Sequence, residues 1–218
     1  MPRGAVDAVT GGRRAASSVD VGRGCARVDL SLAPGGSVFA VFYKGEKASA
    51  PVGEKPHAPG VMPLERVWRV TFDPKWGGPE GQVAFSELGD WTLNRDPRMR
   101  FYSGTATYRV DFDLPDGFRL EGAEIDLGSV RDVAEVSLNG RSLGVLWTPP
   151  FKVRADGLGR RGNVLEVKVT NLWANRLIGD SALPEGESVA KTDRNPFSPD
   201  SPLMPSGLLG PVCLLLGP

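Results

Sequence analysis

The residues best suited to chemistry lie in one short segment, residues 171–180, with the sequence NLWANRLIGD. It carries Trp173, Asn175, Arg176 and Asp180 directly after an alternating stretch that is typical of a strand. An indole offers an apolar platform for the C–H face of a sugar ring, and nearby polar groups can bond the hydroxyls around it. The segment therefore indicates a sugar site. The structural alternative is that Trp173 covers the core while Asn175 and Arg176 bond loop backbone groups.

Two further aromatic residues precede or follow predicted strands. Trp147 opens the sequence WTPPF, in which each proline fixes φ and removes a backbone donor. Such a rigid connection can hold Trp147 at an opening or at the edge of the core. Tyr102 leads into a strand, where its phenol either faces a ligand or serves the structure.

Carboxylates in the predicted loops raise the question of catalysis. Retaining glycosidases need two carboxyl groups about 5 Å apart, and inverting ones about 6.5–9.5 Å. Asp180 is our candidate catalytic acid. Because the chain has 26 acidic residues, such a set arises in any sequence of this composition. The other loop acids that could complete a pair are Glu87, Asp90, Glu185, Glu187, Asp193 and Asp200.

Several kinds of site are excluded by what the sequence lacks. The one histidine, His57, lies in a Pro-rich run and argues against a histidine-based triad or a multi-histidine zinc site. No glycine-rich phosphate motif is present. We therefore expect no cofactor and no catalytic metal, with a structural calcium ion as the alternative. The formal net charge of zero argues against nucleic acid as a partner, and no stretch approaches the ~18 apolar residues of a membrane helix.

The elements that must position these residues are short strands. The chain has 28 glycines and 19 prolines in 218 residues, about twice the average share. Alternating strands are expected at 67–72, 105–114, 124–127, 133–138, 142–146, 151–154, 163–170 and 208–216, with Asn139-Gly140 as a hairpin turn and a short helical turn at 85–91 capped by Ser86. This pattern predicts an all-β fold, an antiparallel β-sandwich.

The chain divides into three predicted parts. Residues 1–23 lack periodicity and are interpreted as a flexible arm. Residues 24–63 comprise a hairpin, from strands at 26–32 and 37–43, and a Pro-rich linker. Residues 64–218 form the sandwich. Cys25 and Cys213 are expected to remain unpaired thiols. We see no secretory signal near the start, which leaves a cytoplasmic protein and a fragment of an exported enzyme as alternatives.

A series of motifs then resembles a known family. In order they are YSGTATYR (102–109), IDLG (125–128), VSLNGRSLG (136–144), WTPPF (147–151), NLWANRLIGD (171–180) and SGLLGP (206–211). The series is similar to the galactose-binding-like β-sandwich, or sugar-binding domain, of large glycoside hydrolases. It resembles family 2 and, more closely, the C-terminal part of family 106 rhamnosidase-like proteins, over roughly residues 65–216.

The resemblance implies a jelly-roll sandwich that frames a sugar site. In those enzymes the catalytic carboxylates lie mainly on a separate (β/α)8 barrel, and no barrel fits in this chain. The resemblance also implies which side chains face the sugar. They are Tyr102, Trp147, Trp173, Asn175, Arg176 and Asp180.

Three hypotheses follow. The first is a carbohydrate-binding sandwich that belongs to or derives from a glycoside hydrolase. The second is a small stand-alone glycosidase with two loop carboxylates. The third is an interaction module that docks on a separate catalytic chain. A carbohydrate ligand is the expected partner, with a catalytic glycosidase domain or a second copy as further partners.

Overall fold

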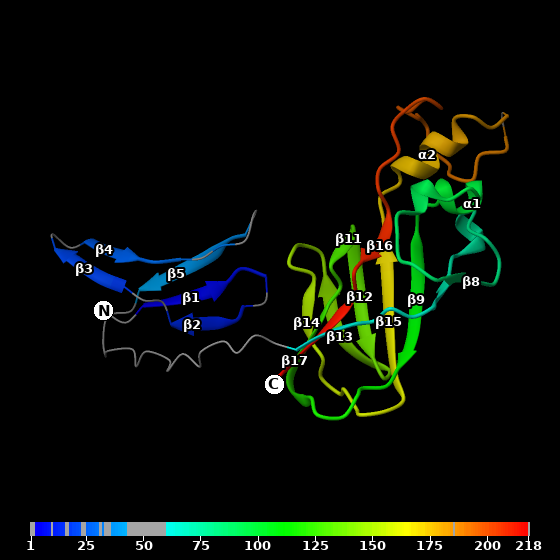
Figure 1. The fold of residues 1–218 in the computed structure, drawn as a ribbon. Helices are drawn as coiled ribbons and strands as arrows, with labels where there is room; N and C mark the ends of the chain where they lie inside the picture. The colour runs from blue at the N-terminus through cyan, green and yellow to red at the C-terminus, as the bar shows by residue number, and fades with distance from the viewer. Residues whose placement is uncertain are drawn as a thin grey trace. The chain divides into compact units, whose positions relative to one another are not determined.

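The computed structural model describes residues 3–9, 11–15, 18–22, 25–30, 32, 36–42, 60–184 and 186–217. The chain forms two compact units, residues 1–57 and 58–218. Figure 1 shows the strands of both units. His57 and most of the predicted linker lie outside the described residues.

Among the residues that the structure describes, the first unit has five short strands. β1 (Arg3–Asp7) pairs with β2 (Arg13–Ala15) and with β5 (Val38–Phe42), and β3 (Ser18–Gly22) pairs with β4 (Cys25–Val28). Three strands thus occupy the segment that was interpreted as an arm. The predicted hairpin is wrong in its pairing, since β4 and β5 each bond to an earlier strand rather than to each other.

The second unit is built on a six-stranded antiparallel sheet in the order β13-β12-β15-β9-β7-β8. Buried and exposed residues alternate along its central strands, because one face of the sheet covers the core and the other meets solvent. The bounds are β7 (Trp68–Thr71), β8 (Gln82–Phe85), β9 (Thr105–Phe112), β12 (Val133–Leu138), β13 (Arg141–Leu146) and β15 (Asn163–Thr170).

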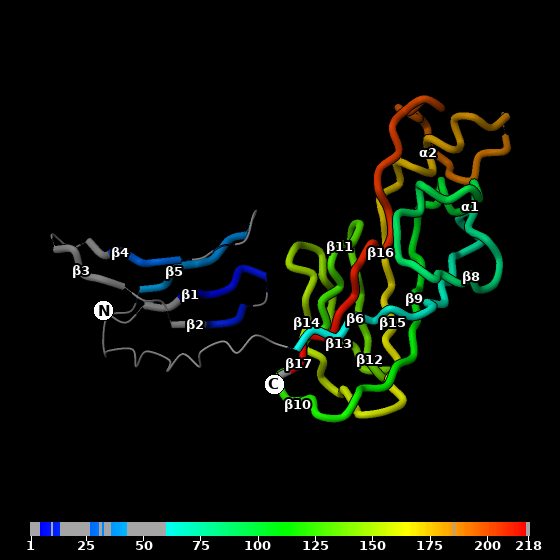
Figure 2. The backbone as a smooth tube through the Cα atoms, viewed as in Figure 1, coloured from blue at the N-terminus to red at the C-terminus, as the bar shows by residue number. Residues whose placement is uncertain are grey.

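A second sheet, in the order β14-β10-β17-β6, completes the sandwich, and β11 and β16 form a two-stranded sheet beside it. Figure 2 traces how the last strands of the chain return alongside the earlier ones. The first strand of this sheet, β6, lies within the predicted linker and pairs with β17. The bounds are β6 (Gly60–Pro63), β10 (Arg119–Asp126), β11 (Ser129–Arg131), β14 (Lys152–Arg154), β16 (Gly207–Gly210) and β17 (Cys213–Gly217).

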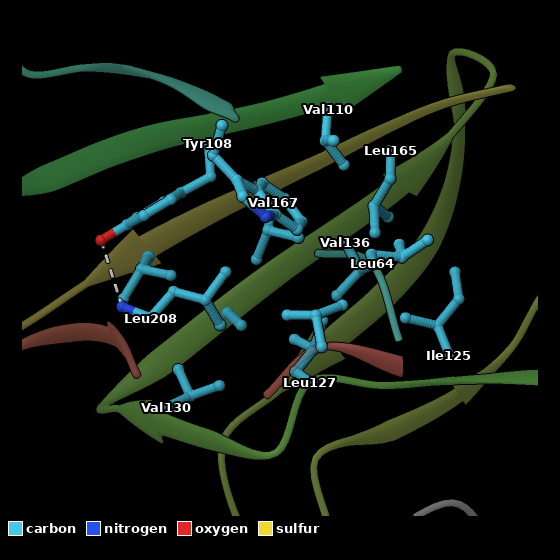
Figure 3. Close-up of a cluster of buried hydrophobic side chains, with 14 of the residues drawn as sticks. Leu64, Tyr108, Val110, Ile125, Leu127, Val130, Val136, Leu165, Val167 and Leu208 are labelled. Atoms are coloured by element: carbon cyan, nitrogen blue, oxygen red, sulfur yellow. Dashed lines mark hydrogen bonds between the residues drawn. The ribbon is translucent and has the colours of Figure 1, made fainter. Parts of the chain in front are cut away.

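The core lies between the sheets. Figure 3 shows inward-facing aliphatic side chains around Tyr108, whose phenol oxygen accepts from the Leu208 backbone N–H at 3.2 Å and from Trp91 Nε1 at 2.5 Å. Each of these three residues is fully buried or nearly so. The Tyr108 hydroxyl thus satisfies two donors that would otherwise be buried without partners. The antiparallel β-sandwich that the sequence predicts is confirmed.

The short helices are where the structure departs most from the predicted elements. No helix begins at Ser86: β8 ends at Phe85, and the helical turn is η2 (Trp91–Leu93), capped by the Asp90 carboxylate. The others are η1 (Pro74–Trp76), α1 (Pro97–Arg100) and α2 (Ala174–Asp180), the last within the segment interpreted as a loop. None of the described helices is long and apolar enough to span a bilayer.

Candidate functional site

The candidate site residues gather at one end of the six-stranded sheet. The register aligns Leu146 with Ala134 and Val133 with Thr170, and it aligns Thr170 with Thr105. The connections after β13 and β15 and before β9 therefore emerge at the same end. All six residues that the sequence singled out lie on these connections. We call this end of the sheet the helical end, because α1 and α2 lie there (Figure 1).

Three tryptophans of the helical end are open to solvent. Trp147 follows β13, Trp173 follows β15, and Trp76 closes η1 after β7, with exposed fractions of 60%, 48% and 38%. Trp76 and Trp173 contact each other edge to face, with ring centroids 5.1 Å apart and planes at 85°. Exposed indoles gathered at one end of a sandwich can serve as stacking platforms for a ligand.

Two hydroxyl groups lie at the same end of the sheet, on β9 and on β15, the strand that leads to Trp173. Thr105 Oγ1 and Thr170 Oγ1 are 2.7 Å apart on the solvent-facing side of neighbouring β9 and β15. β15, which leads to Trp173, is two strands away from β13, which leads to Trp147. Neighbouring strands are about 4.8 Å apart, so the two connections emerge about 10 Å from each other. The end of the sheet therefore combines apolar platforms with hydroxyl partners.

A buried polar network holds the segment that carries Trp173. Asn171 donates from Nδ2 to Tyr102 O at 2.9 Å and to Ser206 Oγ at 3.0 Å, and its Oδ1 accepts from Gly104 N at 2.9 Å. Ser103 Oγ donates to Leu172 O at 2.8 Å. Three segments that are far apart in sequence are joined in this way. The start of α2 is fixed by side chains rather than by its own short hydrogen-bond ladder.

Asn175 belongs to the same network. It is almost fully buried, donates to Met204 O at 2.7 Å and to Ser206 Oγ at 3.0 Å, and accepts from Met204 N at 2.8 Å. Every polar atom of its amide is engaged within the chain. Asn175 thus holds the segment 204–206, which leads into β16, against α2.

Tyr102 is fully buried, and its hydroxyl is bonded on both sides. It donates to Thr105 O at 2.9 Å and accepts from Asp73 N at 3.1 Å. Burial raises the pKa of the Tyr102 phenol above its usual range. The ring packs edge to face on Phe72 and Trp91. Tyr102 therefore ties the segment after β7 to the start of β9.

Arg176 and Asp180 form a buried ion pair along α2. Arg176 Nε lies 2.9 Å from Asp180 Oδ1, and the side chains are 7% and 3% exposed. The contact has the geometry of an ion pair rather than of an aligned hydrogen bond. Asp180 Oδ2 accepts from Ala190 N at 2.8 Å. Both carboxylate oxygens of our candidate catalytic acid are thus engaged inside the protein.

The six predicted site residues therefore lie at one end of the sheet but in two environments. Trp147 and Trp173 face solvent, whereas Tyr102, Asn175, Arg176 and Asp180 are buried and bonded within the chain. Sequence reasoning did not single out Trp76, the third exposed indole at this end of the sheet. It also missed Asn171 as the centre of the network, because its partners lie far away in sequence.

A metal ion requires several ligand side chains close together. Within the described ranges, no group of three or more His, Cys, Asp or Glu side chains is close enough together to hold an ion. Cys213 carries a free thiol whose pKa is raised mainly by burial.

A hollow of about 730 Å³ lies beside the start of β7 and the end of β8, and none of the three exposed tryptophans lines it. Both charged and aliphatic residues line it, among them Glu65, Arg66, Val67, Glu87, Leu88 and Leu209. The one tryptophan among its lining residues, Trp68, is buried. We therefore centre the candidate site on the helical end, where the exposed indoles are.

Comparison with known proteins identifies large glycoside hydrolases as relatives. The chain is 33% identical to the rhamnosidase from Novosphingobium sp. PP1Y, with a TM-score of 0.80 over 99% of this chain and 20% of that chain. It is 36% identical over 180 residues to a protein of Formosa agariphila named "Putative beta-glucuronidase". That alignment covers 71% of this chain and 15% of the Formosa protein. No protein-family model matches.

A more distant neighbour supports the fold alone. The β-glucuronidase from Ruminococcus gnavus in complex with D-glucuronic acid aligns with a TM-score of 0.53 at 20% identity, over 77% of this chain and 31% of that chain. The sequence-based resemblance to a sandwich of large glycoside hydrolases is confirmed by these relatives. The chain spans about a fifth or less of the length of the rhamnosidase and of the Formosa protein.

Proposed function

We propose that residues 58–218 form a carbohydrate-binding sandwich that belongs to or derives from a glycoside hydrolase. Its sugar surface would be the helical end, with Trp147 and Trp173 as the predicted platforms and Trp76 added to them. The observation that carries the proposal is the exposure of these three indoles at one end of a single sheet. The glycoside hydrolase relatives support a carbohydrate as the ligand.

The buried residues have a different part in this proposal. Asn175 and Tyr102 frame the surface from beneath, since their polar atoms are already bonded within the chain. Thr105 and Thr170 offer exposed hydroxyls at this end of the sheet that could bond a sugar. The stand-alone glycosidase gains no support from Asp180, because both of its carboxylate oxygens are engaged and its side chain is buried.

Titration calorimetry of the full chain tests the proposal. Because the named relatives are a rhamnosidase and β-glucuronidases, the panel should hold rhamnosides and glucuronides, with galactosides and plant oligosaccharides added. We expect at least one ligand to bind at millimolar concentration or better, and Trp173→Ala to weaken it about tenfold, the upper worth of one aromatic contact. Leu120→Ala, on the other sheet, is the control. Absence of binding to the whole panel would count against the proposal.

A second candidate function is supported by the same surface. Leu93, Leu172 and Met204 are also exposed near the helical end, with fractions of 83%, 54% and 47%. Such an apolar surface can dock on a partner protein, and a catalytic glycosidase domain is the predicted partner. Binding of free oligosaccharide, lost in Trp147→Ala and Trp173→Ala, favours the sugar surface over a docking surface.

A further inference from the structure

We propose that the buried Arg176–Asp180 ion pair is the positioning device that holds Trp76 and Trp173 in contact, so that it sets sugar affinity without touching sugar. The inference deepens the proposed function and rests on it for the sugar. The two indoles reach the surface from different parts of the sheet. Trp76 comes from η1 after β7, and Trp173 is the residue immediately before α2.

The guanidinium of Arg176 lies close to two glycines. A Cβ at Gly77 would lie 3.1 Å from Arg176 Nη1, and one at Gly179 would lie 2.7 Å from Arg176 Nη2. Gly77 directly follows Trp76, and Gly179 belongs to α2. One terminal nitrogen therefore lies near the backbone just after η1, and the other lies near the backbone of α2. The guanidinium fits there because Gly77 and Gly179 have no side chain.

Asp180 fixes the guanidinium in this position. Its Oδ1 lies 2.9 Å from Arg176 Nε, one helical turn away, and its Oδ2 accepts from Ala190 N. The backbone N–H of Arg176 donates to Ser103 Oγ at 3.0 Å, which ties the same residue to the segment before β9. Arg176 thus has both its main chain and its side chain immobilised beneath the tryptophan pair.

The energetics of buried ion pairs favour a positioning role. Removing two charges from water costs much of what their attraction returns, so such a pair adds little net stability compared with apolar residues of the same size. What holds the pair in one geometry is close packing, because Arg176 Nη1 and Nη2 lie 3.1 Å and 2.7 Å from where a Cβ at Gly77 and at Gly179 would be. Here that geometry sets how η1 lies against α2, and therefore how Trp76 lies against Trp173.

A ligand-free spectroscopic signal reports this geometry. Two indoles 5.1 Å apart couple their electronic transitions and give an exciton couplet in circular dichroism. Among the aromatic contacts of the described residues, this is the one between two tryptophans. We expect a couplet in the unchanged protein that disappears in Trp76→Phe, which identifies its source.

The test compares the couplet and the sugar affinity in three variants of the full chain. Arg176→Met keeps an unbranched side chain as far as the position of Nε and removes the charge and the terminal nitrogens. It should lose more than half of the couplet and about tenfold in affinity. Val167→Ala removes buried volume in β15 and should lower the melting temperature while keeping the couplet. Arg176→Lys keeps the charge without the fork, and it should regain stability but not the couplet.

The outcomes separate this inference from the proposed function. A full couplet in a folded Arg176→Met overturns the positioning role whatever the sugar data show. If no sugar binds but the couplet depends on Arg176, the proposed function fails and the positioning role stands. Should Arg176→Met not fold, Asp180→Asn decides, because the amide oxygen still accepts from Ala190 N. A folded Asp180→Asn with an unchanged couplet again overturns the inference.

Discussion

Asn171 gives the sharpest quantitative prediction, because one buried amide joins three segments beneath Trp173. In Asn171→Ala the carbonyl of Tyr102 and the N–H of Gly104 both lose their side-chain partner. Ser206 Oγ keeps its contact with Asn175 Nδ2, so it is not left without a partner. Two orphaned groups at about 1.5 kcal/mol each predict a loss of about 3 kcal/mol in the free energy of unfolding. That is a large share of the 5–15 kcal/mol that stabilises a typical domain.

Urea unfolding followed by tryptophan fluorescence measures this loss. All five tryptophans belong to the second unit, so the signal reports the sandwich. The matched control is Asn195→Ala, which removes exposed contacts with Leu177 O and Phe197 N. Water can replace these contacts, so the control should change the free energy of unfolding by less than about 0.5 kcal/mol. A loss below about 1 kcal/mol in Asn171→Ala, or one equal to that of the control, would refute the reasoning.

Two further predictions concern the core beneath the same end. Gly207 has φ +104°, and a Cβ there would lie 2.5 Å from Trp91 Nε1; Gly207→Ala should therefore cost about 3 kcal/mol from overpacking and backbone strain. Gly89→Ala, where a Cβ would meet open space, is its control in the same thermal melts, and equal melting temperatures would contradict the clash. Burial raises the pKa of the Tyr108 phenol, so its neutral form is favoured in the folded state. Stability should be constant below the ordinary tyrosine pKa of about 10 and fall as the pH rises above it. Tyr108→Phe should show a shallower fall, and an identical alkaline profile would show that Tyr108 does not cause it.

The strands were the most predictable part of the chain. Residues 105–114 alternate strictly and contain β9 (Thr105–Phe112). Asn139-Gly140 forms the turn between β12 and β13, with φ values of 52° and 78°. Both signals are local, since the alternation reflects one wet face and the positive φ values need Asn and Gly. The strands of the first unit were found in part, but their pairing was not, because β4 and β5 bond to strands earlier in the chain.

The candidate site was predictable in place but not in chemistry. The residues that the motifs singled out lie at one end of the sheet, but motif order could not separate exposed Trp173 from buried Asn175 and Arg176. That distinction depends on contacts with Ser103 and Met204, which are remote in sequence. The spacing of Arg176 and Asp180, one helical turn apart, was a local signal for α2 that the polar composition of the segment obscured.

The most direct test of the central claim is a two-dimensional NMR titration that follows the indole N–H signals of the five tryptophans with a saccharide from the panel. Single Trp→Phe variants assign the signals. The sugar surface predicts shifts for exposed Trp76, Trp147 and Trp173, and unchanged signals for Trp68 and Trp91, which are 1% exposed in the core. Saturating saccharide that leaves the three exposed indoles unshifted would contradict a sugar surface at the helical end.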